Sequence, residues 1–162
     1  FMVDESGVLE KYVQELIKRK REFRLFTNVR FNYVWKLVKP EYNEKEGRPL
    51  EAAIKLLPPR ERDLYNFDVE IKVYQQWWQE KNHKQRVQLI NHELMHLEVE
   101  VDEAMQVRCD DDGRVKLRLL PHDVYIVGFK QEWNEYGIPV EAKQVLQSIV
   151  RENKNRDRTE AS

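Results

Sequence analysis

The chain has few of the features that hold small secreted domains together. Its 162 residues include a single cysteine, Cys109, which excludes an intramolecular disulfide framework and a zinc site built from cysteines. One cysteine is also typical of a reducing compartment. No early segment has the regions of a signal peptide, and no apolar run approaches the roughly 20 residues that span a bilayer. We therefore expect a cytoplasmic protein with no membrane partner.

Neither sign of charge dominates the sequence. Its 28 Lys and Arg residues are balanced by 29 Asp and Glu residues, so overall electrostatics favour neither nucleic acid nor an anionic membrane as a partner. The one basic run covers residues 18–21, with Arg24 close behind, and we interpret it as the solvated face of a helix. Nucleic acid is not an expected partner, and the sequence leaves the oligomeric state open.

Length and hydrophobic content fit one α+β domain over residues 1–162, and apolar periodicity predicts both helices and strands within it. Helices are expected over residues 8–26, 82–101, 120–133 and 140–152, and strands over residues 30–38 and 67–74, the latter as a half-buried or edge strand. Residues 52–57 fit either a strand or a short helix. Asp and Gly residues at 110–113 predict a hairpin turn between arms at 104–109 and 114–119. The polar residues 153–162 are expected to form a frayed tail.

The most specific chemical signal is His92-Glu93-x-x-His96 inside the second predicted helix, residues 82–101. Two histidines four residues apart share one helical face, so both imidazoles can reach one divalent ion, and Glu93 can reach a water that the ion activates. The apolar stripe of this helix falls on the opposite side from the two histidines. Its residues are Val87, Ile90, Leu94, Leu97 and Val101. The motif therefore predicts a zinc site that lines a cleft.

A catalytic zinc needs a third protein ligand and keeps its fourth position for water. His122 is the favoured candidate, because a hairpin of about a dozen residues can return the chain to the cleft. A carboxylate from Glu100 or Glu103 is the alternative. Asp123, next to His122, either orients an imidazole or caps its helix, and we favour the cap.

With zinc in place, Glu93 is the expected general base for the hydrolysis of a carbonyl compound. Reactions of this class use a donor that stabilises the developing oxyanion. The sequence leaves that donor open among Tyr125, Arg118 and Arg114.

Three segments together resemble the putative phage metallopeptidase family. They are the strand Asp68-Val-Glu-Ile-Lys-Val, the helix from Arg86 to His96, and His122-Asp123-Val124 after a hairpin. The resemblance implies a phage- or prophage-encoded, zincin-like α+β domain, similar in layout to minimal SprT-type zincins, with a small sheet packed against the metal-binding helix and flanking helices. It also implies His92, His96 and His122 as metal ligands and Glu93 as the catalytic residue.

The sequence is therefore compatible with two functions. The first is a zinc-dependent metallopeptidase that hydrolyses peptide bonds of a peptide or protein substrate inside the bacterial host cell. The alternative is a catalytically silent zincin-like phage protein that binds a host or phage partner.

Overall fold

Two units make up the chain in the computed structural model, which describes residues 1–39, 41–43, 48–122, 135–137 and 140–160. The first unit comprises Phe1–Asn43 and Arg48–Pro121, and the second comprises Glu44–Gly47 and His122–Ser162. That the whole chain acts as a single domain stays a prediction. Across the described ranges, no helix combines the length and the apolar character needed to cross a bilayer.

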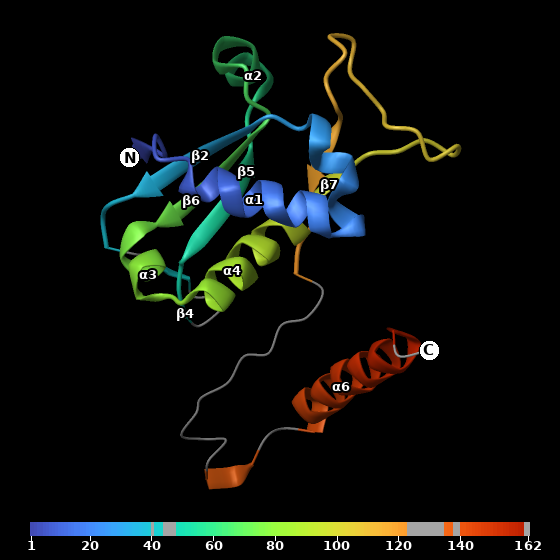
Figure 1. The fold of residues 1–162 in the computed structure, drawn as a ribbon. Coiled ribbons are helices and arrows are strands. Elements are labelled where there is room, and N and C mark those ends of the chain that lie inside the picture. The colour runs from blue at the N-terminus through green and yellow to red at the C-terminus, as the bar shows by residue number, and fades with distance from the viewer. Residues whose placement is uncertain (40, 44–47, 123–134, 138–139, 161–162) are drawn as a thin grey trace. The chain divides into compact units, whose positions relative to one another are not determined.

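A four-stranded sheet forms the centre of the first unit (Figure 1). In spatial order its strands are β1 Met2–Val3, β2 Phe31–Lys36, β6 Val69–Tyr74 and β5 Ala52–Leu56. The two inner strands, β2 and β6, run parallel, and both outer pairings are antiparallel. Residues 52–56 thus form a strand, and β6 is an inner strand with one buried face. The predicted α+β class is confirmed.

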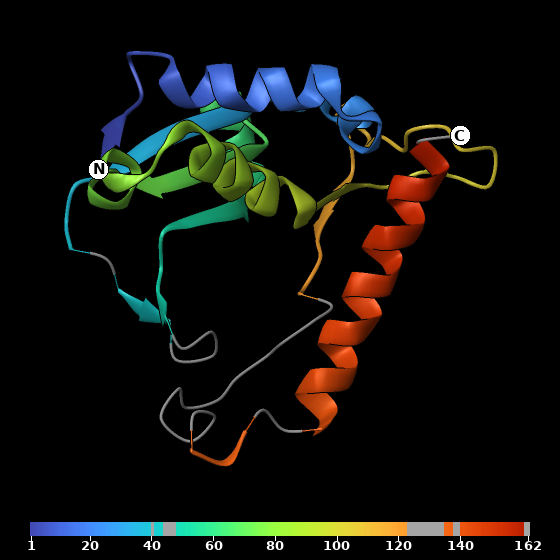
Figure 2. The same cartoon turned by 60° about the horizontal axis from the view of Figure 1, so that its bottom comes forward.

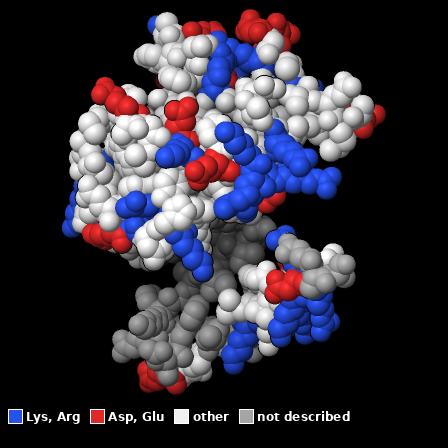
Figure 3. Space-filling model, in the orientation of Figure 1, with Lys and Arg blue, Asp and Glu red and all other residues white. Residues whose placement is uncertain are grey.

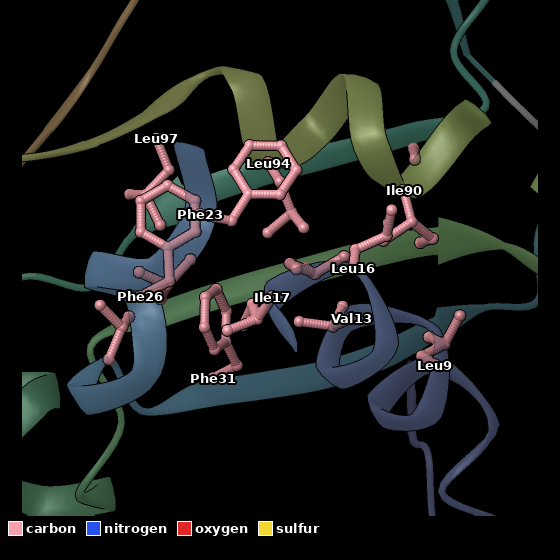
Figure 4. Close-up of a cluster of buried hydrophobic side chains, with 14 of the residues drawn as sticks. Leu9, Val13, Leu16, Ile17, Phe23, Phe26, Phe31, Ile90, Leu94 and Leu97 are labelled. Carbon is pink, nitrogen blue, oxygen red and sulfur yellow. The ribbon is translucent and has the colours of Figure 1, made fainter. Parts of the chain in front are cut away.

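The core lies between this sheet and two helices, α1 Val8–Arg19 and α4 His83–Met95. Figures 1 and 2 show α1 running along one face of the sheet, and Figure 4 shows side chains of both helices meeting over it. On β6, every second residue from Val69 to Val73 is fully buried, which matches the two-residue period of a strand. The helix α1 buries side chains at helical spacing, namely Leu9, Val13, Leu16 and Ile17.

The expected helix over residues 8–26 is corrected by the structure. The α-helix ends at Arg19, Lys20 takes an extended conformation, and the 3₁₀ helix η1 follows at Arg21–Asn28. Its buried residues Phe23 and Phe26 are three apart, the period of a 3₁₀ helix, so each turn places one ring in the core.

The first unit also contains several short helices and strands. They are β3 Tyr42–Asn43, β4 Arg48–Pro49, α2 Pro59–Tyr65 and α3 Gln75–Glu80. The sequence analysis missed α2. Proline at its first position was the available signal, because proline lacks an N–H and the first N–H of a helix has no intrahelical partner.

The predicted helix over residues 82–101 is too long. It ends at Met95, and β7 Leu97–Val99 pairs antiparallel with β8 Leu117–Leu119. From Leu97 onward apolar and charged residues alternate, and the side chains of β7 are buried in the same alternation. That change of period from 3.6 to 2 favours a strand, and it was legible in the sequence.

The predicted turn at residues 110–113 is confirmed. Gly113 has a φ of +76°, and the Asp110 carboxylate accepts hydrogen bonds from the backbone N–H groups of Asp112 and Arg114. The arms are shorter than expected. Cys109 bridges to Val115, whereas β8 pairs with β7 instead of continuing the hairpin.

The second unit contains α6, Val140–Glu160. The expected end at residue 152 is corrected, since residues 153–160 are helical, and this stretch contains no proline or glycine that would stop a helix. The helix expected over residues 120–133 falls mostly on residues 123–134, which lie outside the described residues.

Candidate metal centre

The helix α4 carries the motif and is anchored at its start and along one side. A reciprocal pair of hydrogen bonds between Asn82 and Gln85 caps its first turn, each side chain bonding to the other residue's backbone N–H at 3.0 Å. Ile90 and Leu94 are fully buried in the core (Figure 4). These contacts hold the intervening residues in a fixed orientation.

Three histidines come together in the structure. The candidate ligand atoms of His92, His96 and His122 all lie within 4.8 Å of one another, and each residue is half-buried. The rings of His92 and His96 have centroids 5.0 Å apart and are nearly perpendicular. His122 directly follows Pro121, and the backbone just before it is tied to the end of α4.

That tie is a pair of hydrogen bonds between His96 and Leu120. The backbone N–H of Leu120 donates to the carbonyl oxygen of His96 at 2.7 Å, and Nδ1 of His96 lies 2.7 Å from the carbonyl oxygen of Leu120. A carbonyl oxygen only accepts, so Nδ1 carries the proton and the lone pair belongs to Nε2. This is the arrangement that a metal-binding histidine needs, because the bond fixes both the tautomer and the ring orientation.

The donor set fits zinc. Around a tetrahedral zinc with Zn–N distances of about 2.1 Å, neighbouring nitrogens are roughly 3.4 Å apart. The histidine nitrogens are up to 4.8 Å apart, so each must move by less than about 1 Å to reach that spacing. Rotation of the side chains is enough for such a movement. Imidazole nitrogens suit zinc, whereas magnesium and calcium prefer oxygen ligands.

Glu93 lies between the two motif histidines and is only 6 % exposed. It is one of two buried residues of charged or polar type among those described, the other being Asp68. A carboxylate withdrawn from solvent interacts more strongly with nearby charges than a solvated one. Glu93 therefore combines the chemistry of a proton acceptor with a low-dielectric position.

The carboxylate alternatives for the third ligand lie elsewhere. Glu100 follows β7, its backbone N–H donates to Lys116, and its carboxylate is 3.7 Å from a guanidinium nitrogen of Arg108. Among the described residues, the group suited to a metal includes neither Glu100 nor Glu103. Both residues follow the end of α4 at Met95.

Two of the other candidate site residues form ion pairs in the structure. Arg118 pairs with Glu98 across β7 and β8, and this bond raises the pKa of the Arg118 guanidinium. Arg114 lies 3.1 Å from the carboxylate of Asp63. Tyr125 and Asp123 lie outside the described residues. The identity of an oxyanion donor stays open.

One contact of the metal helix was missed by the sequence analysis. Lys20 Nζ donates to Asn91 Oδ1 at 2.6 Å, which joins the basic run to the residue before His92. Lys18, Arg19, Arg21 and Arg24 are exposed, as expected for a solvated face. In the orientation of Figure 1, Figure 3 shows Lys and Arg gathered around the end of α1 and η1, with Asp and Glu beside them. No spacing rule links Lys20 to Asn91, because 71 residues separate them.

Comparison with known proteins gives one family. A family model described as putative phage metallopeptidase matches residues 2–152. Neither the curated proteins nor the solved structures give a match.

Proposed function

Because the chain belongs to the putative phage metallopeptidase family, we propose that it is a zinc-dependent peptidase with Glu93 as its general base. The proposed zinc ligands are His92, His96 and His122. The observation that carries the proposal is their convergence within 4.8 Å, with Nδ1 of His96 already bonded to the Leu120 carbonyl. Three imidazoles leave one zinc position open, as catalytic zinc sites do.

The reaction would be the hydrolysis of a peptide bond in a peptide or protein substrate. Bound zinc would supply Lewis acidity, which lowers the pKa of a water molecule and polarises the substrate carbonyl. Glu93 would accept the proton of the attacking water and deliver it to the amine nitrogen as the C–N bond breaks. The Leu120 carbonyl would hold the His96 ring in one orientation throughout.

The metal site is tested by elemental analysis of purified protein after zinc loading and dialysis. We expect about one zinc per chain in the wild type and a strong loss in His122→Ala. Two variants serve as controls. His83→Ala removes a histidine of the same helix whose Nδ1 contacts the Tyr12 hydroxyl at 3.0 Å, and Glu100→Ala removes the carboxylate alternative. Loss of zinc in Glu100→Ala with retention in His122→Ala would overturn the three-histidine assignment.

The peptidase activity is tested by incubating the zinc-loaded protein with a complex peptide mixture and identifying the products by mass spectrometry. Glu93→Gln should abolish cleavage while zinc stays bound, because the amide cannot accept the proton. Glu41→Gln, which alters an exposed carboxylate paired with Lys36, should cleave as the wild type does. A zinc-loaded wild type that cleaves nothing would favour the silent binding protein instead.

A further inference from the structure

A small polar hollow lies beside His92 within the first unit. Its volume is about 270 Å³, and it is lined by Glu51, Lys81, Gln85, Gln88, Leu89 and His92. All of these except Leu89 are polar. Pockets for drug-sized ligands are typically about 300–1,000 Å³ and mostly apolar. This hollow is smaller and more polar, and its size and lining suit a single polar side chain.

An ion pair sets the charge of the hollow. Lys81 Nζ lies 3.0 and 3.1 Å from the two carboxylate oxygens of Glu51, and these side chains are only 17 % and 21 % exposed. The pair joins the residue before β5 to the residue just after α3. Because the two charges offset each other, the pair gives neither an entering carboxylate nor an entering ammonium a net attraction, and either group must disturb a partly desolvated pair.

The hollow also offers hydrogen-bonding groups to a neutral ligand. Gln85 Oε1 accepts from the backbone N–H of Asn82 at 3.0 Å, which fixes its carboxamide and leaves Nε2 as the donor end. Gln88 is exposed and supplies a second carboxamide, with both donor and acceptor capacity. An apolar side chain would strip water from these groups without replacing its hydrogen bonds, at a cost in affinity.

We propose that this hollow is the subsite for the substrate side chain beside the cleaved bond, and that it selects a neutral, hydrogen-bonding side chain such as glutamine or asparagine. The inference rests on the proposed peptidase function. Its basis is that His92 belongs both to the lining of the hollow and to the proposed zinc ligands. A side chain held in the hollow therefore lies next to the reacting bond.

Two reciprocal variants test the selectivity in the zinc-loaded full chain. Product mapping from a peptide mixture should give enrichment of glutamine and asparagine at one position next to the cleaved bond. Glu51→Gln leaves the Lys81 charge unbalanced and should shift that position toward acidic residues, whereas Lys81→Gln should shift it toward basic residues. Each shift should be about two- to fivefold, the effect of one partly exposed charge pair.

A second ion pair provides the matched control. Lys55 and Glu70 lie 3.4 Å apart on the neighbouring strands β5 and β6, outside the lining of the hollow. Lys55→Gln and Glu70→Gln should leave the preference unchanged. If peptides are cleaved but Glu51→Gln and Lys81→Gln leave the preference unchanged as well, the subsite is overturned while the peptidase function stands.

A binding measurement separates the hollow from catalysis. In NMR titrations of the zinc-loaded protein, N-acetylglutamine amide should shift the side-chain amide signals of Gln85 and Gln88, and N-acetylleucine amide should not. Gln88→Leu, at an exposed position that leaves the fold intact, should weaken the glutamine response at Gln85 several-fold. These shifts without any peptide cleavage would refute the peptidase function and keep the hollow as a polar side-chain site. Equal shifts with both ligands, or none, would overturn the inference.

Discussion

The buried carboxylate of Asp68 pairs with two arginines, Arg30 and Arg62. Asp68 is 2 % exposed and accepts five hydrogen bonds, three from Arg30 and two from Arg62, at 2.9 to 3.2 Å. Arg62 also donates to the Val115 carbonyl at 3.3 Å, which links the sheet to the hairpin that leads to β8 and His122. We expect Asp68→Asn to lower the free energy of unfolding substantially.

The magnitude follows from the geometry. Both carboxylate oxygens accept hydrogen bonds from nitrogen donors. The NH₂ group of an asparagine side chain at this position would therefore face at least two of these donors and could accept from neither. Breaking a buried ion pair while the partner charges remain costs about 3–5 kcal/mol. The Arg62 side chain is 16 % exposed but that of Arg30 is 35 % exposed, so water reaches one guanidinium. We therefore expect a loss in the free energy of unfolding at the lower end of this range, about 3 kcal/mol.

Urea unfolding followed by circular dichroism measures this change. The midpoint should fall while the slope stays constant, since the variant alters stability and not the surface exposed on unfolding. Glu41→Gln is the matched control. Glu41 pairs with Lys36 at 2.6 Å but is 71 % exposed, so its loss should change the free energy of unfolding by less than about 1 kcal/mol. A change below about 1 kcal/mol in Asp68→Asn would refute the reasoning.

The same carboxylate makes stability depend on pH. Burial alone raises the pKa of Asp68, but the bonds from Arg30 and Arg62 outweigh it and hold the pKa below its usual value. A group with a lowered pKa in the folded state stabilises the fold above its unfolded pKa, and this contribution is lost as the pH falls through the folded value. The stability difference between wild type and Asp68→Asn should thus be constant above about pH 5 and shrink below about pH 4. A difference that did not shrink in acid would contradict this assignment.

Three further predictions concern the metal helix. Asn82→Ala removes the cap of α4 and should lower the free energy of unfolding by about 1 kcal/mol in urea titrations. Ile90→Ala, at a fully buried position, should lower it by about 2–5 kcal/mol in the same assay, and a smaller loss would mean that α4 is not packed as described. Zinc at about 100 times its dissociation constant should stabilise the wild type by about 2.7 kcal/mol, or about 5–11 °C in a thermal melt. His83→Ala should keep this shift and His122→Ala should lose it.

Local patterns in the sequence were enough to identify the helix that carries the histidines. Helical periodicity is a local property, because it depends only on residues within a few turns. It therefore identified the spacing of His92 and His96 and the apolar positions of Ile90 and Leu94. The alternation on β6 and the Asp-Gly turn at Gly113 were legible for the same reason. The end of α4 was also encoded locally, in the alternation from Leu97, but the longer helical stripe concealed it.

What the tertiary structure decided is which distant residues meet. The bond between Nδ1 of His96 and the Leu120 carbonyl joins residues 24 apart, and it depends on the pairing of β7 with β8 in one register. The contact of Lys20 with Asn91 and that of Lys81 with Glu51 likewise join segments with no shared local pattern. Such contacts form only when the chain closes long loops around a common core, and the entropy of that closure is offset by burial across the whole unit, which no short stretch of sequence specifies.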